Sequence, residues 1–298
     1  MISPETLYVI GNGFDLWHGI PSKYSDFRNF IRANDRELFQ QLENYLPVED
    51  DWSNLESALA DLDVDFLIDN HGCFLTPYGA EDWSDSGHHD FQYEIEQVVR
   101  QLSSELLTQF TRWVRSIDVT QSADARLNLE TSSSVFLNFN YTGTLNSLYG
   151  IAPERILHIH GCAEKTDQDL VLGHAWNPSM RPSLNDFDGV EDLDVRLHEA
   201  HSIIDSYFAS TFKPTAEILK QHDQFFRNLS NVSKVLVLGH SLSEVDAGYI
   251  RAVHEVCGEV TDWRVASRDP AKETGRVNLL RSIGVGEDQI QWFPWSQF

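Results

Sequence analysis

Apolar positions along the chain fall into two patterns. Short apolar runs that stop at glycine or polar residues are typical of buried parallel strands, and they occur at residues 7–10, 135–139, 156–161 and 234–238. Two further runs predict late strands at residues 263–266 and 289–293. Between these runs, apolar residues recur at helical spacing and predict helices at residues 16–46, 50–59, 91–117, 144–149, 195–229, 245–256 and 271–282. A helix start with Ser22 as N-cap lies inside the first of these tracts, and a break near Lys213-Pro214 interrupts the fifth.

Strands that alternate with helices predict an α/β fold with a doubly wound, Rossmann-like parallel sheet. We expect a single domain over residues 1–298. The helical tracts at about residues 16–117 and 190–230 exceed ordinary crossovers, so we expect them to be insertions that form a helical layer over the carboxyl edge of the sheet. The polar, non-periodic stretch at residues 70–90 predicts a long loop, for which we expect a gating role.

Charge and cysteine content narrow the class of protein. The chain of 298 residues has a formal net charge of -24 at pH 7, so most of its surface repels nucleic acid and anionic membranes. No apolar run is long enough to cross a bilayer, and residues 1–4 do not resemble a signal peptide. The 3 cysteines lie far apart, and the spacing of His71, His88 and His89 matches no known ligand set. We therefore expect a cytoplasmic protein that binds no metal.

Polar residues follow the predicted strands at their carboxyl ends. Because these ends meet at one edge of a parallel sheet, the side chains there are expected to form a pocket. The glycines of the first turn would let the phosphates of a ligand approach the backbone, although a glycine pair can also serve packing alone. The strand-end segments are Gly11-Asn12-Gly13-Phe14-Asp15, Asn138-Phe139-Asn140-Tyr141, His158-Ile159-His160-Gly161 and Gly239-His240-Ser241.

Six motifs in this order resemble a known family. They are Ile10-Gly-Asn-Gly-Phe-Asp-Leu16, Trp52-Ser-Asn-Leu-Glu56, Phe139-Asn-Tyr-Thr142, His158-Ile-His-Gly161, Leu172-Gly-His174, and Gly239-His-Ser-Leu242 followed by Asp246. Together they resemble the AbiH family of bacteriophage abortive-infection proteins. Their order is also distantly similar to that of the sirtuins, in which a glycine-rich turn, an asparagine motif, a His-Gly and a Gly-x-Ser surround NAD.

The sirtuin resemblance implies a role for each matching residue. Asn140 would position an attacking water beside the nicotinamide ribose, and His160 would act as base or hydrogen-bond partner toward that ribose. Asp15 would stabilise the positive charge that develops as the N-glycosidic bond breaks. Gly11, Asn12 and Gly13 would contact the phosphates, Gly239 and Ser241 would hold the adenosine, and the pocket would include Phe14, Tyr141, Gly161, His240 and Asp246.

The resemblance implies a phage-defence enzyme that hydrolyses NAD, its substrate, to nicotinamide and ADP-ribose. The chain lacks the two Cys-x-x-Cys pairs of the sirtuin zinc ribbon, so protein deacetylation is not implied. Two alternatives stay open. One is a non-catalytic sensor that binds NAD or an ADP-ribose-type nucleotide and controls a partner. The other is an enzyme that acts on a different nucleotide or a nucleic-acid end, which the net charge disfavours. Expected partners are a small nucleotide and a second copy of the chain or a defence-system protein.

Overall fold

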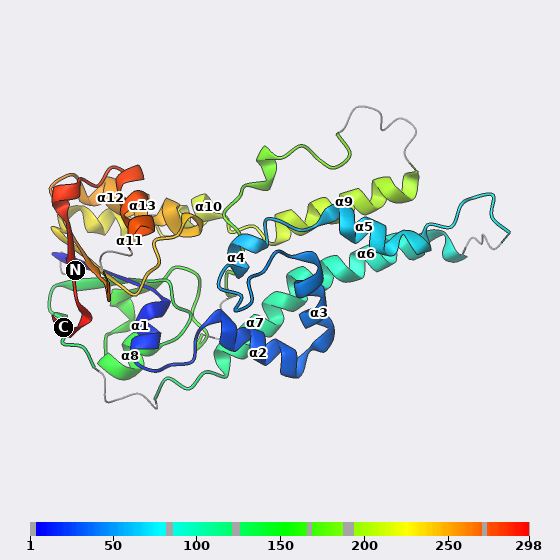
Figure 1. The fold of residues 1–298 in the computed structure, drawn as a ribbon. Coiled ribbons are helices and arrows are strands. Elements are labelled where there is room, and N and C mark those ends of the chain that lie inside the picture. Colours follow the sequence, from blue (N-terminus) through cyan, green and yellow to red (C-terminus); the bar gives the residue numbers. More distant parts are fainter. Residues whose placement is uncertain are drawn as a thin grey trace. The chain divides into compact units, whose positions relative to one another are not determined.

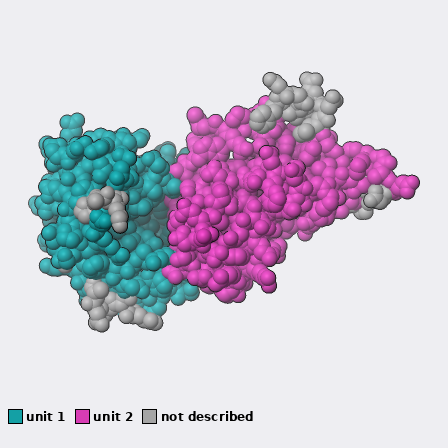
Figure 2. Space-filling model, in the orientation of Figure 1, with its two compact units in different colours: residues 1–23, 111–171, 214–298 teal, residues 24–110, 172–213 magenta. Residues whose placement is uncertain are grey.

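The chain forms two compact units, coloured separately in Figure 2. The computed structural model describes residues 4–81, 86–120, 126–165, 169–186, 194–269 and 273–297. Unit 1 comprises residues 1–23, 111–171 and 214–298, and unit 2 comprises residues 24–110 and 172–213. Unit 2 thus contains most of the first helical tract expected from the sequence. It contains only part of the second, because residues from 214 onward belong to unit 1.

Unit 1 is built on a six-stranded sheet with the order β3-β2-β1-β4-β5-β6. Every neighbouring pair of strands is parallel, which confirms the predicted doubly wound α/β fold. Thr6 at the start of the central strand pairs with Ser134 on one side and Lys234 on the other. The strands are β1 (Thr6–Ile10), β2 (Ser134–Asn138), β3 (Ile156–His158), β4 (Lys234–Leu238), β5 (Asp262–Ala266) and β6 (Ile290–Phe293).

Helices cover both faces of this sheet (Figure 1). Alternate residues of a strand point to opposite faces, so Tyr8 and Ile10 pack with Phe14, whereas Leu7 and Val9 join a larger cluster on the other face. The first face is covered by α1 (Asn12–Trp17) and α8 (Thr144–Tyr149). The second is covered by α10 (Thr215–Gln221), α11 (Asp223–Arg227), α12 (Ala247–Cys257) and α13 (Thr274–Ser282). Apolar cover on both faces explains why the strands are short continuous apolar runs.

The described part of unit 2 is helical. Helix α6 packs along α9 over most of its length, and a π-helical turn at Gln101–Glu105 separates α6 from α7. The predicted helix at residues 91–117 is confirmed as this α6–π–α7 tract. The helices that lie wholly or partly in unit 2 are α2 (Tyr24–Asn34), α3 (Arg36–Tyr45), α4 (Leu55–Ala58), α5 (Val64–His71), α6 (Asp90–Arg100), α7 (Leu106–Arg115) and α9 (Val195–Ser210).

Some predicted boundaries were wrong. Residues 16–46 are not one continuous helix, because α1 ends at Trp17 and the chain turns through Gly19 (φ 72°) and Pro21; α2 begins at Tyr24, two residues after the predicted N-cap Ser22. Of the helix predicted at residues 50–59, only α4 (Leu55–Ala58) forms, because the left-handed backbone of Trp52 (φ 56°) cannot belong to a right-handed helix. The third strand stops at His158, so His160 is not a strand residue.

Two other predictions fall partly outside the described residues. The segment predicted as a loop at residues 70–90 contains the end of α5 and two short 3-10 helices, Gly72–Phe74 and Ser86–His89, while residues 82–85 lie outside the described residues. Its expected gating role stays a prediction. The helix predicted at residues 271–282 is confirmed from Thr274 onward, and residues 270–272 are outside the described part.

A backbone contact joins the turns that follow β1 and β4. The Gly13 N–H donates a hydrogen bond of 2.8 Å to the Gly239 carbonyl. A Cβ atom on Gly11 would lie 2.4 Å from the Cα of His240, and one on Gly13 would lie 2.7 Å from the Cα of Gly239. Gly239 itself has a φ of +73°, and a Cβ there would lie 2.2 Å from the Phe14 nitrogen. Only glycine allows the two turns to approach this closely.

We expect Gly239→Ala to lower the free energy of unfolding by about 3 kcal/mol or more, because it adds a clash with backbone atoms to the cost of a left-handed alanine. Gly150 is the matched control, since its φ is +63° but a Cβ there would meet nothing within 4 Å. Gly150→Ala should cost about 1–2 kcal/mol. Urea denaturation of both variants measures the difference. Equal losses of unfolding free energy in Gly239→Ala and Gly150→Ala would show that the contact between the two turns does not contribute to stability.

Candidate functional site

The predicted strand-end residues lie at the point where the strand order of the sheet reverses. In the order β3-β2-β1-β4-β5-β6, the chain builds outward from β1 in one direction and from β4 in the other. Ligands of open α/β sheets bind outside the carboxyl ends of the strands at such a switch point. The turns after β1 and β4 meet there through Gly13 and Gly239.

A buried carboxylate follows β1. Asp15 is 1% exposed, and its Oδ2 and Oδ1 accept hydrogen bonds from the hydroxyl groups of Thr142 (2.6 Å) and Thr144 (2.7 Å). These contacts tie α1 to the loop between β2 and α8. Burial raises the pKa of Asp15, although the bonds from Thr142 and Thr144 and the nearby amide of Asn140 act in the opposite direction.

Polar contacts at both the N–H and the carbonyl fix the backbone of Asn140. Its N–H donates to the Asn138 side-chain Oδ1 at 3.1 Å, and its carbonyl lies 3.1 Å from Nδ1 of His158. The same Nδ1 also lies 3.3 Å from Nδ2 of Asn138, so this ring nitrogen faces both an acceptor and a donor. Burial lowers the pKa of His158 to about 4, which keeps this imidazole neutral at pH 7. The buried side-chain amide of Asn140 lies near enough to the Asp15 carboxylate to lower the pKa of that group, but its Nδ2 makes no hydrogen bond of ordinary geometry to the described residues.

An aspartate from the segment after β4 lies between two histidines, one after β3 and one after β4. Asp246 occupies the N-cap position of α12, but its side chain makes no cap hydrogen bond. Its Oδ1 is 3.8 Å from Nε2 of His160, and its Oδ2 is 3.4 Å from Nε2 of His240. The Leu242 N–H donates to Nδ1 of His240 at 2.9 Å, so the proton of this imidazole is on Nε2 and faces Asp246.

Aromatic rings enclose the His160 imidazole. The ring centroids of Phe139 and Tyr249 lie 5.5 Å and 5.4 Å from it, and His160 is 3% exposed. Phe139 also contacts the ring of His240, at 4.2 Å. The Asp246 carboxylate and the two imidazoles thus lie in a largely apolar surrounding.

The other predicted residues occupy mixed positions. Gly161 takes a φ of +87°, and the Tyr141 hydroxyl donates to the Val171 carbonyl at 2.8 Å, so both shape the loop after β3. Ser241 is exposed, and exposed Asn12 accepts a hydrogen bond from Ser22. Phe14 is buried in the core beside Tyr149 (5.6 Å between ring centroids), which places it in packing contacts.

The glycine turn has a structural explanation that does not need a ligand. The Gly13 N–H already bonds the Gly239 carbonyl, and the Phe14 N–H bonds the Gly11 carbonyl at 2.9 Å. The space beside both turn glycines is filled by the Gly239–His240 backbone. Of the two explanations that the sequence left open, packing accounts for Gly11, Gly13 and Gly239 directly.

Sequence reasoning missed the roles of Thr142 and Thr144. Both hydroxyl groups are buried, and they supply the partners that Asp15 requires. The available signal was position, because these threonines follow a strand whose carboxyl end lies at the same edge as that of β1.

Two of the motifs lie in unit 2. Oε2 of Glu56 pairs with Nζ of Lys213 at 2.5 Å, and Lys213 is 0% exposed. Tyr24 donates to the other oxygen of Glu56. His174 is 1% exposed, with Nε2 3.2 Å from the Phe208 carbonyl, and burial lowers its pKa. These motifs hold the interior of unit 2 together.

Two searches of the described residues gave negative findings. No three His, Cys, Asp or Glu side chains within them converge on a common point as metal ligands would. None of the helices in that part of the chain combines the length and the apolar composition needed to cross a bilayer.

The fold and the strand-end groups define a doubly wound parallel α/β protein with a polar site at the carboxyl edge of its sheet. The model of the family described as "Bacteriophage abortive infection AbiH" matches residues 7–266, so the chain belongs to this family. Membership confirms the family resemblance drawn from the six motifs and implies a role in abortive-infection defence against phage. The sirtuin resemblance stays a prediction. Searches of curated proteins and of solved structures found no significant match.

The raised pKa of Asp15 predicts a pH-dependent difference in stability. Because folding raises this pKa above its ordinary value of 3.8, the folded protein binds the proton more tightly than the unfolded chain. The stability that Asp15 contributes is therefore full below the unfolded pKa and is lost as the pH rises through the folded pKa. We expect the free energy of unfolding of the wild type to fall relative to Asp15→Asn as the pH rises above the ordinary value of 3.8.

Urea denaturation of both proteins at several pH values measures this difference. Asp223→Asn removes one charge at an exposed site and serves as the control. A difference between wild type and Asp15→Asn that is constant, or that grows in favour of the wild type with pH, would contradict the expectation.

Proposed function

We propose that this protein binds NAD at the carboxyl edge of the unit 1 sheet and hydrolyses its N-glycosidic bond to nicotinamide and ADP-ribose in phage defence. Family membership supports the defence role. The strand order and the polar groups at the switch point support a nucleotide as the ligand. The distant similarity to sirtuins supports NAD among the nucleotides.

The buried amide of Asn140 carries the proposal. Its approach to Asp15 falls short of an ordinary hydrogen bond, and a buried N–H that is left unsatisfied costs about 1–3 kcal/mol. Asn138 and His158 fix the backbone of Asn140, which keeps the amide in place. Such an amide can donate to a ribose hydroxyl or orient a water, which would satisfy it only when substrate is bound.

His160 and Asp246 supply the proton acceptor. In the hydrolysis, water oxygen forms a bond to the ribose C1′ while the bond from C1′ to the nicotinamide nitrogen breaks. The electron pair of that bond goes to the ring, so nicotinamide leaves neutral, and the proton of the water goes to the His160 imidazole. The Asp246 carboxylate, 3.8 Å from Nε2 of His160, stabilises the imidazolium that forms.

Asp15 acts through electrostatics and position. Its carboxylate lies beside Asn140 and holds the Thr142–Thr144 loop, so it supports the segment that presents the amide. Positive charge that develops on the ribose favours the ionised form of a carboxylate whose pKa burial has raised. The turn glycines are used in packing, so the proposal rests on these ribose-facing groups rather than on a phosphate cradle.

Turnover of NAD by the purified protein, with nicotinamide and ADP-ribose separated by chromatography, tests the proposal. We expect Asn140→Ala and His160→Ala each to lower turnover by roughly a hundredfold or more, because each removes a group that acts in the transition state. Asn228→Ala changes an exposed asparagine of the same unit and should retain wild-type turnover.

Parallel measurements in infected cells separate the enzyme from the sensor. The enzyme predicts that cellular NAD falls during infection with wild type and not with Asn140→Ala, and that protection in a plaque assay follows NAD loss. Intact NAD together with protection by wild type contradicts hydrolysis. If NAD also raises the thermal stability of the purified protein in that case, the sensor is the correct function.

A further inference from the structure

The loop that leads from β4 to α12 contains a strained residue. Leu242 has a φ of 53°, in the left-handed region that is disfavoured for any residue with a Cβ atom. Its side chain is 3% exposed and packs in the larger core cluster of unit 1, which holds the backbone in this conformation. Strain of this kind persists where the surrounding structure requires it, and it is frequent at functional sites. The contacts of Leu242 therefore indicate what the strain serves.

The strained backbone fixes the tautomer of His240. The Leu242 N–H donates to Nδ1 of His240 at 2.9 Å, and a ring nitrogen that accepts a hydrogen bond carries no proton. The proton of this ring is therefore on Nε2. The ring itself is buried, with its centroid 4.2 Å from that of Phe139, and a Cβ atom on Gly11 would lie 2.4 Å from the Cα of His240. His240 is thus a hydrogen-bond donor whose position and tautomer are both fixed.

Asp246 faces this donor and a second imidazole. Its Oδ2 is 3.4 Å from Nε2 of His240, and its Oδ1 is 3.8 Å from Nε2 of His160. An acid at the start of α12 could instead bond to the N–H groups of the first helical turn, but the Asp246 side chain makes no such cap bond. Because one oxygen is directed to His240, the other is left for His160. The orientation of the carboxylate toward His160 therefore depends on His240.

We propose that His240 is a positioning residue, which holds Asp246 toward His160 and is itself fixed by the left-handed Leu242. Its effect on the reaction rate rests on the hydrolysis proposed above, in which Asp246 stabilises the imidazolium of His160. The contacts that lead from Leu242 through His240 to Asp246 are present in the ligand-free chain and do not rest on that reaction. The proposal gives His240 and Leu242 a role that the packing of Gly239 does not explain.

Two substitutions separate the two bonds of His240. The amide of Asn lies as far from the backbone as Nδ1, so His240→Asn can accept from the Leu242 N–H but does not reach Asp246. The amide of Gln lies as far as Nε2, so His240→Gln can donate to Asp246. We expect His240→Gln to keep NAD turnover within about tenfold of the wild type. His240→Asn should lose roughly a hundredfold in kcat with KM unchanged, because the lost interaction acts in the transition state.

Thermal unfolding of the same variants tests the structural alternative, in which His240 only joins the turn to α12. His240→Asn keeps a partner for the buried Leu242 N–H, so it should be at least as stable as His240→Gln. Turnover and stability are thus expected in opposite orders. Turnover that is higher in His240→Asn than in His240→Gln, in step with stability, would overturn the proposal.

A measurement without NAD separates this proposal from the proposed function. In NMR spectra of the ligand-free full chain with labelled histidine nitrogens, His240 should carry its proton on Nε2. The ring signals of His160, assigned with His160→Ala, should shift more in His240→Asn than in His240→Gln, since only the former lacks a donor to Asp246. Absence of NAD turnover in the wild type would contradict hydrolysis, whereas these spectra decide the positioning role. A proton on Nδ1 of His240, or His160 signals that are unchanged in His240→Asn, would refute it.

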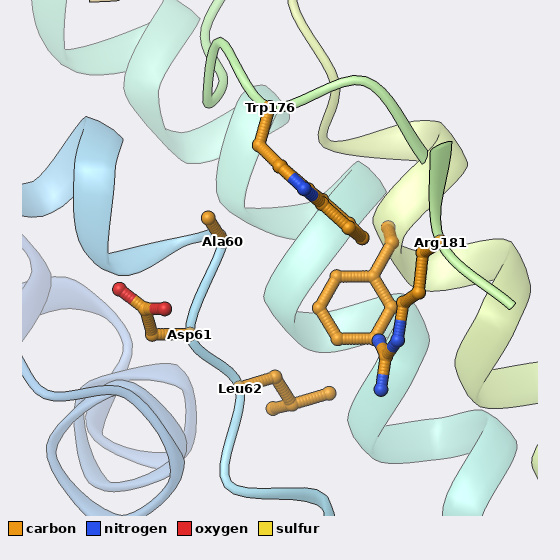
Figure 3. Close-up of a pocket in the computed structure, with 6 residues that line it drawn as sticks. Ala60, Asp61, Leu62, Trp176 and Arg181 are labelled. Carbon is orange, nitrogen blue, oxygen red and sulfur yellow. The ribbon is translucent and has the colours of Figure 1, made fainter. Parts of the chain in front are cut away.

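Two controls exclude general damage to the protein. His254→Asn removes another buried imidazole of unit 1, about 12 Å along α12 from Asp246. Arg181→Met changes the lining of a pocket of about 670 Å³ in unit 2, which Figure 3 shows with Arg181 and Trp176. Both variants should keep wild-type turnover and unchanged His160 signals. A loss of turnover in either of them as large as that in His240→Asn would show that the effect is not specific to His240.

Discussion

The backbone contact between the turn after β1 and Gly239 is the constraint on which the unit 1 site depends. Three glycines permit it, because each of them would place a Cβ within van der Waals radii of the facing backbone. Asp15 follows β1, and the His240–Asp246 segment follows the neighbouring strand β4. The contact between the two turns therefore holds both groups at the same edge of the sheet. The chemistry of the strand ends therefore depends on residues that have no side chains.

The polar groups at this edge form two buried sets with different electrostatic designs. Asp15 is surrounded by neutral donors, the hydroxyl groups of Thr142 and Thr144, so its charge is dispersed without a cation. Asp246 is instead placed between the imidazole rings of His160 and His240. The first set favours a fixed geometry, and the second brings a carboxylate together with two imidazoles. The buried amide of Asn140 lies beside the first set, near Asp15, without a hydrogen bond of ordinary geometry to it.

Much of the fold could be predicted from the sequence because the sheet is covered on both faces. Each strand is then a continuous apolar run, and parallel order follows from the helices between the strands. The boundaries that failed depended on backbone conformation, such as the left-handed Trp52, which no propensity rule assigns to tryptophan. The partners of Asp15 and Glu56 were missed for another reason. Thr142, Thr144 and Lys213 are distant in sequence, and only tertiary packing brings them to those carboxylates.

Each unit is assembled from separate segments of the chain, and this affects the order in which the units can fold during synthesis on the ribosome. The chain passes from unit 1 to unit 2 and back twice, since unit 1 uses residues 1–23, 111–171 and 214–298. Thr6 needs Ser134 on one edge and Lys234 on the other, whereas every residue of unit 2 has been made once Lys213 emerges. At about 5–20 residues per second, β1 waits on the order of ten seconds or more for β4. Unit 2 can thus be complete first, while the apolar central strand of unit 1 remains open on one edge and exposed to aggregation or to chaperones.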